Sequence, residues 1–392
     1  MPDQRTTPDT GARDPFVDFV RAASLVVVVL WHWVFTVVLW QSDGPHTSNP
    51  IGFTSGLFLA TWLLQVMPLF FFVGGWAHTV AIARFVAGGN GSVWRFTLRR
   101  IASLGRPAVA LAIAWWFVGA VVAAAFDVSW TGRAVVLILS PLWFLAIYAV
   151  LVALLPITTW LHRRFDVLVL VWGAGLAALV DVGRFRYGWD ALGWLNMVLV
   201  WGLCHQLGFF YDRLVRASRQ VAWSMAFGGL FTLAALVFSG LYPGSMVGVP
   251  GDRLSNMAPP TVCIAALLVL QVGIALLLRP WVVGRLNTRS SWQRANGLMT
   301  RVSLPLYLFH STGMAIWVTV VYRTVGFNRA FGMTPSMQLD AVWWLSRPLA
   351  VLGPLAFTMP MIWLYLRFHR NPTVAPDEEP VVRPGAAEVA EA

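Results

Sequence analysis

Long apolar runs recur from one end of the chain to the other. A membrane-spanning helix needs about 20 predominantly apolar residues, because the hydrocarbon core of a bilayer is about 30 Å thick. The chain is 58% hydrophobic and 11% charged, whereas a soluble domain carries about 25% charged residues. The sequence therefore predicts an all-α, polytopic transmembrane bundle of about ten helices, over residues 17–40, 57–85, 101–125, 135–156, 166–182, 191–211, 221–241, 261–279, 299–323 and 342–367.

The arginines are unevenly distributed between these runs. All 28 basic residues are arginine, and 21 of them fall on one side of the expected membrane. Cytoplasmic loops carry an excess of basic residues, so the bias predicts that both termini lie in the cytoplasm. We expect a multi-pass protein of the inner (plasma) membrane, divided into a cytoplasmic segment, a membrane domain and a disordered cytoplasmic tail at residues 1–16, 17–368 and 369–392. This topogenic pattern accounts for the net charge of +11 without nucleic-acid binding.

The first apolar run carries a single histidine, His32, among valine, leucine and tryptophan residues. His32 lies 11 residues beyond Arg21, and a helix would place it about 16 Å deeper in the membrane. An ionisable ring at that depth is costly, and it is a functional-site hypothesis by default. A neutral imidazole can accept a proton near neutral pH, as a general base must. A core histidine bonded to a neighbouring helix is the open alternative.

Arginines gather in the segment WRFTLRRIASLGRP, which leads into the third run. Their guanidinium groups match the geometry of phosphate oxygens, so the segment predicts a binding site for a phosphate-bearing donor. Topogenic charge that meets anionic lipid headgroups is the alternative. The residues concerned are Arg95, Arg99, Arg100 and Arg106.

Several further positions have simpler interpretations. The segment MPLFFFVGGWAH at residues 67–78 favours a kink or a close helix approach at its glycine pair, with His78 as a packing residue. Asp181 and Arg184 are spaced to pair within one helix. Cys204 and Cys263 both lie in apolar runs, so neither a disulfide framework nor a metal site is indicated.

Taken in order, the motifs resemble one family. Asp18-x-x-Arg21, His32, FFFVGG, the arginine-rich entry to the third run and LYLFH at residues 306–310 are similar to the acyltransferase-3 family of integral-membrane O-acyltransferases. The resemblance covers about residues 13–367 and agrees with that family's ten-helix count. The segments HQLGFF, NMAPPT and LYLFHST resemble an actinobacterial-type branch of it. Members of the family modify sugars, glycans and small natural products.

The resemblance implies an acyl-CoA donor, usually acetyl-CoA, and a sugar or small-molecule hydroxyl as acceptor. It implies that His32 is catalytic, that Asp18 and Arg21 support it, and that the third-run arginines bind the donor. His32 would deprotonate the hydroxyl, which attacks the thioester carbonyl. We expect His310 to orient the acceptor or to stabilise the oxyanion.

One position departs from the family pattern, and two other functions stay open. The family commonly has Arg-x-x-Arg at the start of the third span, but here Ser103 stands three residues after Arg100, so Arg99 or Arg106 would have to replace the second arginine. A catalytically inactive relative that acts as a scaffold therefore remains an alternative. The other is a transporter or flippase of a glycan or lipid-linked substrate, which inverted repeats would favour. A proton-coupled transporter usually needs carboxylates in its core, and this chain has almost none there.

Overall fold

The structure is a computed structural model. It describes residues 14–41, 44–52, 54–126, 129–249, 252, 254–326, 333–334 and 340–368. Most of the expected N-terminal segment and the whole expected tail, residues 369–392, lie outside the described residues.

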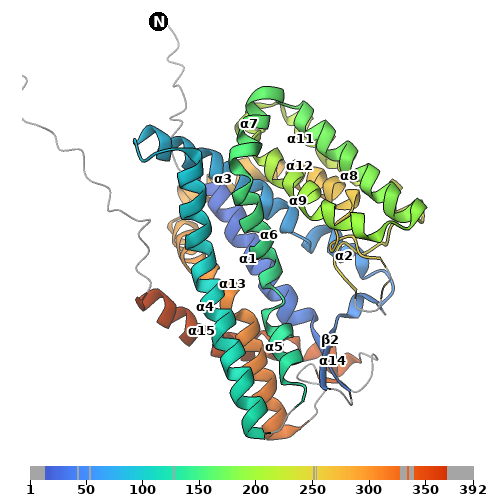
Figure 1. The fold of residues 1–392 in the computed structure, drawn as a ribbon, viewed down its shortest axis with the longest axis vertical. Coiled ribbons are helices and arrows are strands. Elements are labelled where there is room, and N and C mark those ends of the chain that lie inside the picture. The colour runs from blue at the N-terminus through green and yellow to red at the C-terminus, as the bar shows by residue number, and fades with distance from the viewer. Residues whose placement is uncertain are drawn as a thin grey trace, which may run out of the picture.

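The described chain is a helical bundle with one small sheet (Figure 1). Its long helices are α1 (Pro15–Phe35), α3 (Met67–Ala87), α4 (Val93–Phe126), α8 (Leu168–Tyr187), α11 (Arg219–Phe238), α12 (Val262–Thr288), α13 (Ser290–Val325) and α15 (Arg347–Phe368). Shorter helices are α2 (Phe58–Leu64), α5 (Thr131–Leu139), α6 (Leu142–Ala153), α7 (Leu155–Phe165), α9 (Asn196–Gly208), α10 (Tyr211–Arg216) and α14 (Ala341–Leu345), with 3₁₀ turns η1 (Pro50–Gly52) and η2 (Asp190–Leu195). The strands are β1 (Val37–Gln41), β2 (Gly44–Ser48) and β3 (Met333–Thr334).

The helices confirm a multi-pass membrane protein. Among the described residues, eight helical segments are long and apolar enough to cross a membrane, counting α2 and α3 together. The pair α5 and α6, bent by 48°, would make a ninth. The expected run at 191–211 instead forms η2 and the 13-residue α9, which is shorter than a helix that spans a bilayer alone.

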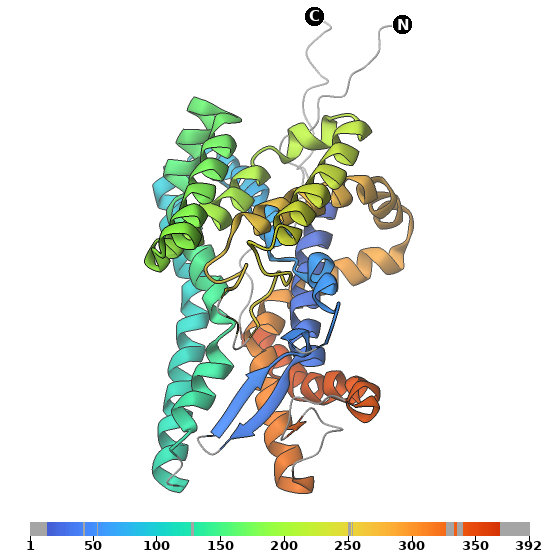
Figure 2. The ribbon, with the colours of Figure 1, turned by 90° about the vertical axis from the view of Figure 1, so that its right-hand side faces the viewer.

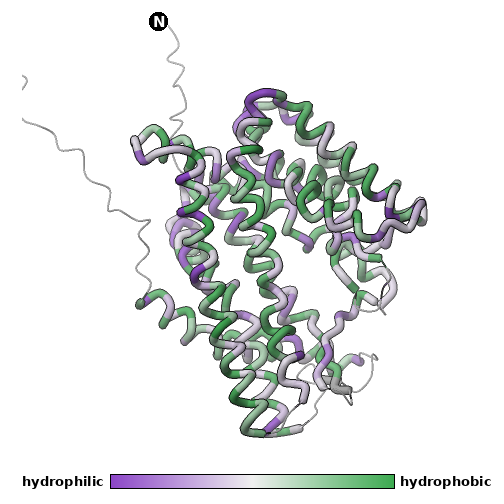
Figure 3. The backbone as a smooth tube through the Cα atoms, viewed as in Figure 1, coloured by the Kyte–Doolittle hydropathy of each residue, from purple (hydrophilic) through white to green (hydrophobic). Residues whose placement is uncertain are grey.

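Apolar side chains also cover outward-facing surfaces of the bundle. Figure 3 shows hydrophobic residues along most of each long helix and hydrophilic residues mainly near helix ends and connections. In α4, Ile113, Trp116 and Phe117 are 62%, 70% and 63% exposed. Exposed aromatic and aliphatic side chains of this size suit contact with lipid rather than with water.

The first apolar run is helical only as far as residue 35. Thr36 is extended, and β1 then pairs antiparallel with β2 and parallel with β3. Thr36, Val37 and Val38 are β-branched, and a run of such residues favours a strand over a helix. The predicted helix over residues 17–40 is therefore too long at its C-terminal end, where Figure 2 shows the hairpin beyond α1.

Helix α1 is an interior helix that packs against α3, α12, α13 and α15. Its start is fixed by Asp14, whose carboxylate accepts a hydrogen bond from the backbone N–H of Phe16 at 2.8 Å. The same carboxylate accepts from the Tyr211 hydroxyl at 2.7 Å and from the Arg279 guanidinium at 3.0 Å. These contacts hold the N-terminal end of α1 against α10 and α12.

Candidate active site

Two histidines from separate helices meet inside the bundle. His32 lies in the last turn of α1, and His310 lies in the middle of α13. Nδ1 of His32 is 2.8 Å from Nε2 of His310, across a sequence separation of 278 residues. The two rings are nearly parallel, with centroids 5.0 Å apart and an interplanar angle of 6°. His310 is 0% exposed, so the pair joins α1 to α13 in the interior.

The hydrogen-bond partners assign the protons when both rings are neutral. Nδ1 of His310 lies 2.6 Å from the carbonyl oxygen of Tyr307, and a carbonyl oxygen can only accept, so Nδ1 carries the hydrogen. Nε2 of His310 must then accept the bond from Nδ1–H of His32. The lone pair of His32 therefore lies on Nε2, which has no hydrogen-bond partner among the described residues. That nitrogen is the atom able to take a proton from a substrate.

Neighbouring groups fix the orientation of the pair. The indole N–H of Trp33 donates to the carbonyl oxygen of His310 at 3.1 Å. The Ser311 hydroxyl lies 3.2 Å from Nε2 of His310, where it can only share the lone pair that accepts from His32 at the shorter distance of 2.8 Å. The Tyr307 hydroxyl donates to the carbonyl oxygen of Pro141, which anchors the turn of α13 that carries the histidine. An imidazole held in this way keeps one tautomer and one direction.

Asp18 and Arg21 do form a pair, but they do not touch His32. The Arg21 guanidinium donates to the Asp18 carboxylate at 2.9 Å, near the start of α1. Because α1 is one continuous helix, Arg21 is about 16 Å and Asp18 about 21 Å from His32 along the axis. Any support that this pair gives His32 is therefore indirect.

Of the four arginines predicted to bind the donor, only Arg100 turns partly inward. Arg95, Arg99 and Arg106 are exposed, and Arg99 lies over the Phe85 ring at 5.5 Å. Nε of Arg100 is buried without a hydrogen-bond partner in the described chain, and so is the hydroxyl of Thr97 one turn earlier. Buried polar atoms are normally hydrogen-bonded, so two unpaired ones on the same face of α4 are consistent with a site that binds water or a ligand.

Ser103, the family's second arginine position, contributes no charge near Arg100. It is exposed, and its hydroxyl donates to the backbone carbonyl of Arg100 at 2.8 Å. Neither of the possible replacements, Arg99 and Arg106, is buried beside Arg100. Arg100 is therefore the best-placed of these residues for a buried donor contact.

A second histidine pair joins α3 and α9. Nδ1 of His78 is 2.9 Å from Nε2 of His205, and Nε2 of His78 is 3.4 Å from the Tyr148 hydroxyl. Helix α3 runs unbroken through its glycine pair, and a Cβ added at Gly75 would lie 1.9 Å from the carbonyl oxygen of His205. The predicted close approach is thus present without a kink. His205 as the partner of His78 was not predicted, because that contact exists only after α3 and α9 have packed.

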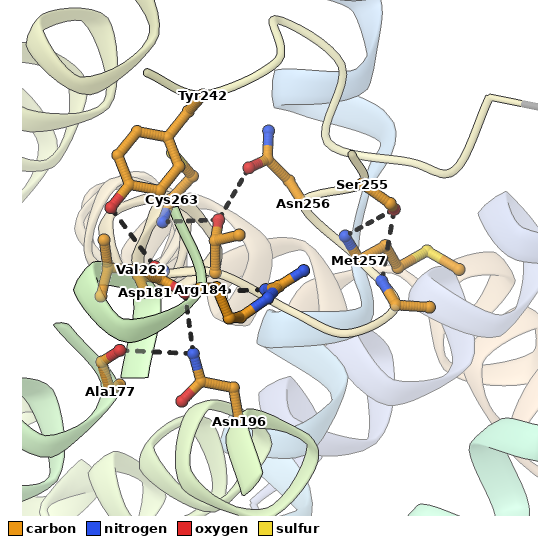
Figure 4. A network of polar contacts seen from close by, with 12 residues as sticks. Ala177, Asp181, Arg184, Asn196, Tyr242, Ser255, Asn256, Met257, Val262 and Cys263 are labelled. Carbon is orange, nitrogen blue, oxygen red and sulfur yellow. Dashed lines mark hydrogen bonds and ion pairs between the residues drawn. The ribbon is translucent and has the colours of Figure 1, made fainter. Parts of the chain in front are cut away.

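Asp181 organises a separate buried network, which Figure 4 shows. Its carboxylate accepts from Asn196 at 3.0 Å, from the backbone N–H of Val262 at 2.9 Å and from the Tyr242 hydroxyl at 3.3 Å. Arg184 lies 3.7 Å away, so the predicted pairing is confirmed. Burial, and then the nearby Asp181 carboxylate, raise the pKa of the Tyr242 phenol, which therefore stays protonated as a donor. The network ties α8, α9 and the loop before α12 together.

We expect Asp181→Ala to destabilise the protein by about 3–5 kcal/mol, because it leaves the buried Arg184 charge without its carboxylate. The measurement is the unfolding transition of detergent-purified protein, followed by tryptophan fluorescence. Asp252→Ala is the matched control, since Asp252 is exposed in the loop before α12. Equal stability losses in the two variants would contradict this assignment.

Comparison with known proteins places the chain in a family. Residues 14–366 match the family model Acyl_transf_3, an acyltransferase domain. No curated protein and no solved structure matches the chain. The matched region contains His32, His310 and Arg100, and it covers most of the 392 residues. The chain therefore belongs to the acyltransferase-3 family.

Proposed function

We propose that the protein transfers an acyl group, normally acetyl, from acyl-CoA to a hydroxyl of a sugar, glycan or small natural product. The observation that carries the proposal is a chain of hydrogen bonds from His32 to His310 and from His310 to the Tyr307 carbonyl. This chain leaves the lone pair of His32 on its Nε2. Membership of an acyltransferase family supports the reaction class. We further propose the inner (plasma) membrane as the location, with both termini in the cytoplasm, because of the arginine bias.

In the proposed step, Nε2 of His32 takes the proton of the acceptor hydroxyl while its oxygen attacks the thioester carbonyl. A carbon–oxygen bond forms, and the tetrahedral intermediate collapses as the carbon–sulfur bond breaks. The imidazolium then returns its proton to the leaving thiolate, so the products are an ester and free CoA. No further reactant is needed.

His310 acts on His32 in this proposal, not on the substrate. Both of its ring nitrogens are already within hydrogen-bond distance of protein groups. By accepting from Nδ1–H, it holds His32 in the tautomer with its lone pair on Nε2 and stabilises the imidazolium that forms. This assigns His310 a positioning role instead of the acceptor or oxyanion contact expected from the sequence.

The separation between Arg100 and His32 suits a long donor. Trp115 lies 15 residues after Arg100 in α4, and its indole donates to the hydroxyl of Thr312, two residues after His310, at 2.9 Å. Arg100 is therefore about 22 Å along α4 from the level of the histidine pair. CoA carries its phosphates and its thioester at opposite ends of an extended pantetheine arm. An acyl-CoA bound with its phosphates near Arg100 and its thioester at His32 would therefore lie extended between the two residues.

We expect Arg100→Gln to weaken acetyl-CoA binding by about tenfold or more, because a charge-assisted hydrogen bond is worth about 1.5–3 kcal/mol. The measurement is the Kd of acetyl-CoA for detergent-purified protein by calorimetry. Arg84→Gln is the control, since Arg84 is an exposed arginine in the last turn of the neighbouring helix α3. If the wild-type protein shows no saturable binding, the proposed donor is wrong.

A further inference from the structure

Arg347 is a buried arginine near the C-terminal end of α1. It is the first residue of α15 and is 7% exposed. Its guanidinium donates to the carbonyl oxygen of Trp343 at 2.8 Å, to the Ser346 hydroxyl at 3.0 Å and to the carbonyl oxygen of Val34 at 3.4 Å. All three acceptors are neutral, and no carboxylate in the described part of the chain forms an ion pair with Arg347. A buried charge without a counter-ion is expensive, which makes it a candidate for ligand binding.

Arg347 lines a small cavity at the C-terminal end of α1. The cavity is about 20 Å³ in volume, and its other walls include Trp33 and Thr36 from the end of α1 and Met314 from α13. Trp33 directly follows His32, and its indole donates to the carbonyl oxygen of His310. The only ionisable side chain in the lining is Arg347. A volume of this size holds a group about as large as one water molecule, such as one end of a carboxylate or phosphate.

The guanidinium of Arg347 has N–H donors left over to bind such a group. A guanidinium has five N–H donors, and three of them are used by Trp343, Ser346 and Val34. One N–H on each terminal nitrogen is left over. One anionic oxygen of a carboxylate or phosphate has the lone pairs to accept both of these N–H bonds.

We propose that Arg347 binds an anionic oxygen group, a carboxylate or phosphate, carried by one of the two reactants. This inference rests on the proposed acyl transfer at His32 and specifies its substrate class. The group belongs either to the acceptor, as in an acidic sugar, or to the acyl chain, as in the half-thioester of a dicarboxylic acid. In both cases Arg347 would hold the reactant beside Trp33, next to the reacting hydroxyl or thioester.

A purely structural role for Arg347 makes a different prediction. The carbonyls of Val34 and Trp343 lie at the C-terminal ends of α1 and α14, where a partial negative charge favours a cation. The guanidinium also stacks on Trp343, 3.7 Å from the ring centroid. If Arg347 only caps these helices, anionic and neutral ligands should change the unfolding temperature of the protein by equal amounts.

The test compares acetate with its neutral isostere acetamide, because these two small ligands differ in whether they can present an anionic oxygen to the cavity. The ligand-induced rise in unfolding temperature of the full chain in detergent reports binding. We expect acetate to stabilise the wild-type protein and acetamide not to, with acetate affinity about tenfold or more weaker in Arg347→Gln. Arg347→Lys keeps the positive charge but lacks the planar set of guanidinium donors, so it should retain part of the preference for acetate over acetamide. It also provides the comparison if Arg347→Gln does not fold. Arg323→Gln, an exposed arginine in the last turn of α13, is the control and should behave as wild type.

Two further ligand pairs assign the source of the anionic group. Succinyl-CoA and butyryl-CoA have acyl chains of equal length and differ in the terminal carboxylate, whereas glucuronate and glucose differ in one carboxylate on a sugar. A preference for succinyl-CoA that Arg347→Gln removes would identify the acyl chain, and a corresponding preference for glucuronate would identify the acceptor. If acetate and acetamide act alike on the wild type, or if Arg347→Gln keeps the preference, Arg347 is a structural cap. Acetate binding needs no acyl transfer, so this result is independent of whether His32 proves catalytic.

Discussion

Replacing His32 with alanine should lower the rate of acyl transfer by about 100- to 10,000-fold, which is the usual contribution of a general base. The variant removes the one nitrogen of the histidine pair that has a free lone pair, but it leaves His310 bonded to Tyr307 and Ser311. The fold should therefore persist. The measurement is the release of free CoA thiol from acetyl-CoA by purified protein in liposomes that contain candidate acceptors.

Two controls separate catalysis from folding in this experiment. Acetyl-CoA should bind His32→Ala with near-normal affinity, because the proposed donor contact at Arg100 is remote from His32. His310→Ala should also be slow, and the double variant should lose no more than His32→Ala alone, since residues that act as one unit are not additive. A His32→Ala protein that transfers acyl groups at the wild-type rate would overturn the mechanism.

Gly75→Val should destabilise the bundle by at least about 3 kcal/mol, the upper part of the range for overpacked interiors. A Cβ at Gly75 would lie 1.9 Å from the carbonyl oxygen of His205, and one at Gly208 would lie 2.0 Å from the carbonyl oxygen of Phe72. Both clashes are with backbone, so no side-chain rotation can relieve them. The measurement is the unfolding temperature of purified protein, together with the yield of folded protein.

Gly228→Val is the matched control for this substitution. Gly228 lies within α11, and a Cβ there would meet nothing within 4 Å. The chemical change and the helical context are the same, so the difference in helix propensity between glycine and valine, which favours valine, is common to both variants. If Gly228→Val is as harmful as Gly75→Val, the close approach of α3 and α9 does not explain the effect.

The helical bundle was predictable because apolar runs report membrane helices directly. The hairpin was not, since its first strand is as apolar as the helix before it, and β1 gains its pairing from β2 and from the distant β3. The length of α9 was also missed. Its predicted run begins in η2, where Gly193 packs against Arg184 so closely that a Cβ would lie 2.6 Å from Nε.

The candidate site was predictable in its parts and not in its assembly. His32 is recognisable because it is alone in an apolar run, but its bond to His310 depends on how α1 packs on α13. Arg100 was predicted together with three other arginines, and the sequence did not single it out, because its place beside the buried Thr97 and Leu104 on one face of α4 is seen only in the structure. Arg347 falls near the start of the run expected at residues 342–367, and spacing alone does not reveal that its guanidinium is buried against the end of α1.

The wide separation of the two paired histidines has a consequence for biosynthesis. The ribosome makes α1 first, and His310 follows 278 residues after His32. Until α13 is inserted, the imidazole of His32 has no partner within the nascent bundle, and an unsatisfied polar group in lipid is costly. A chain that stops before α13 would contain the candidate base but not the group that orients it. Under the proposed mechanism, His32 would therefore be oriented as a base only after α13 has packed on α1.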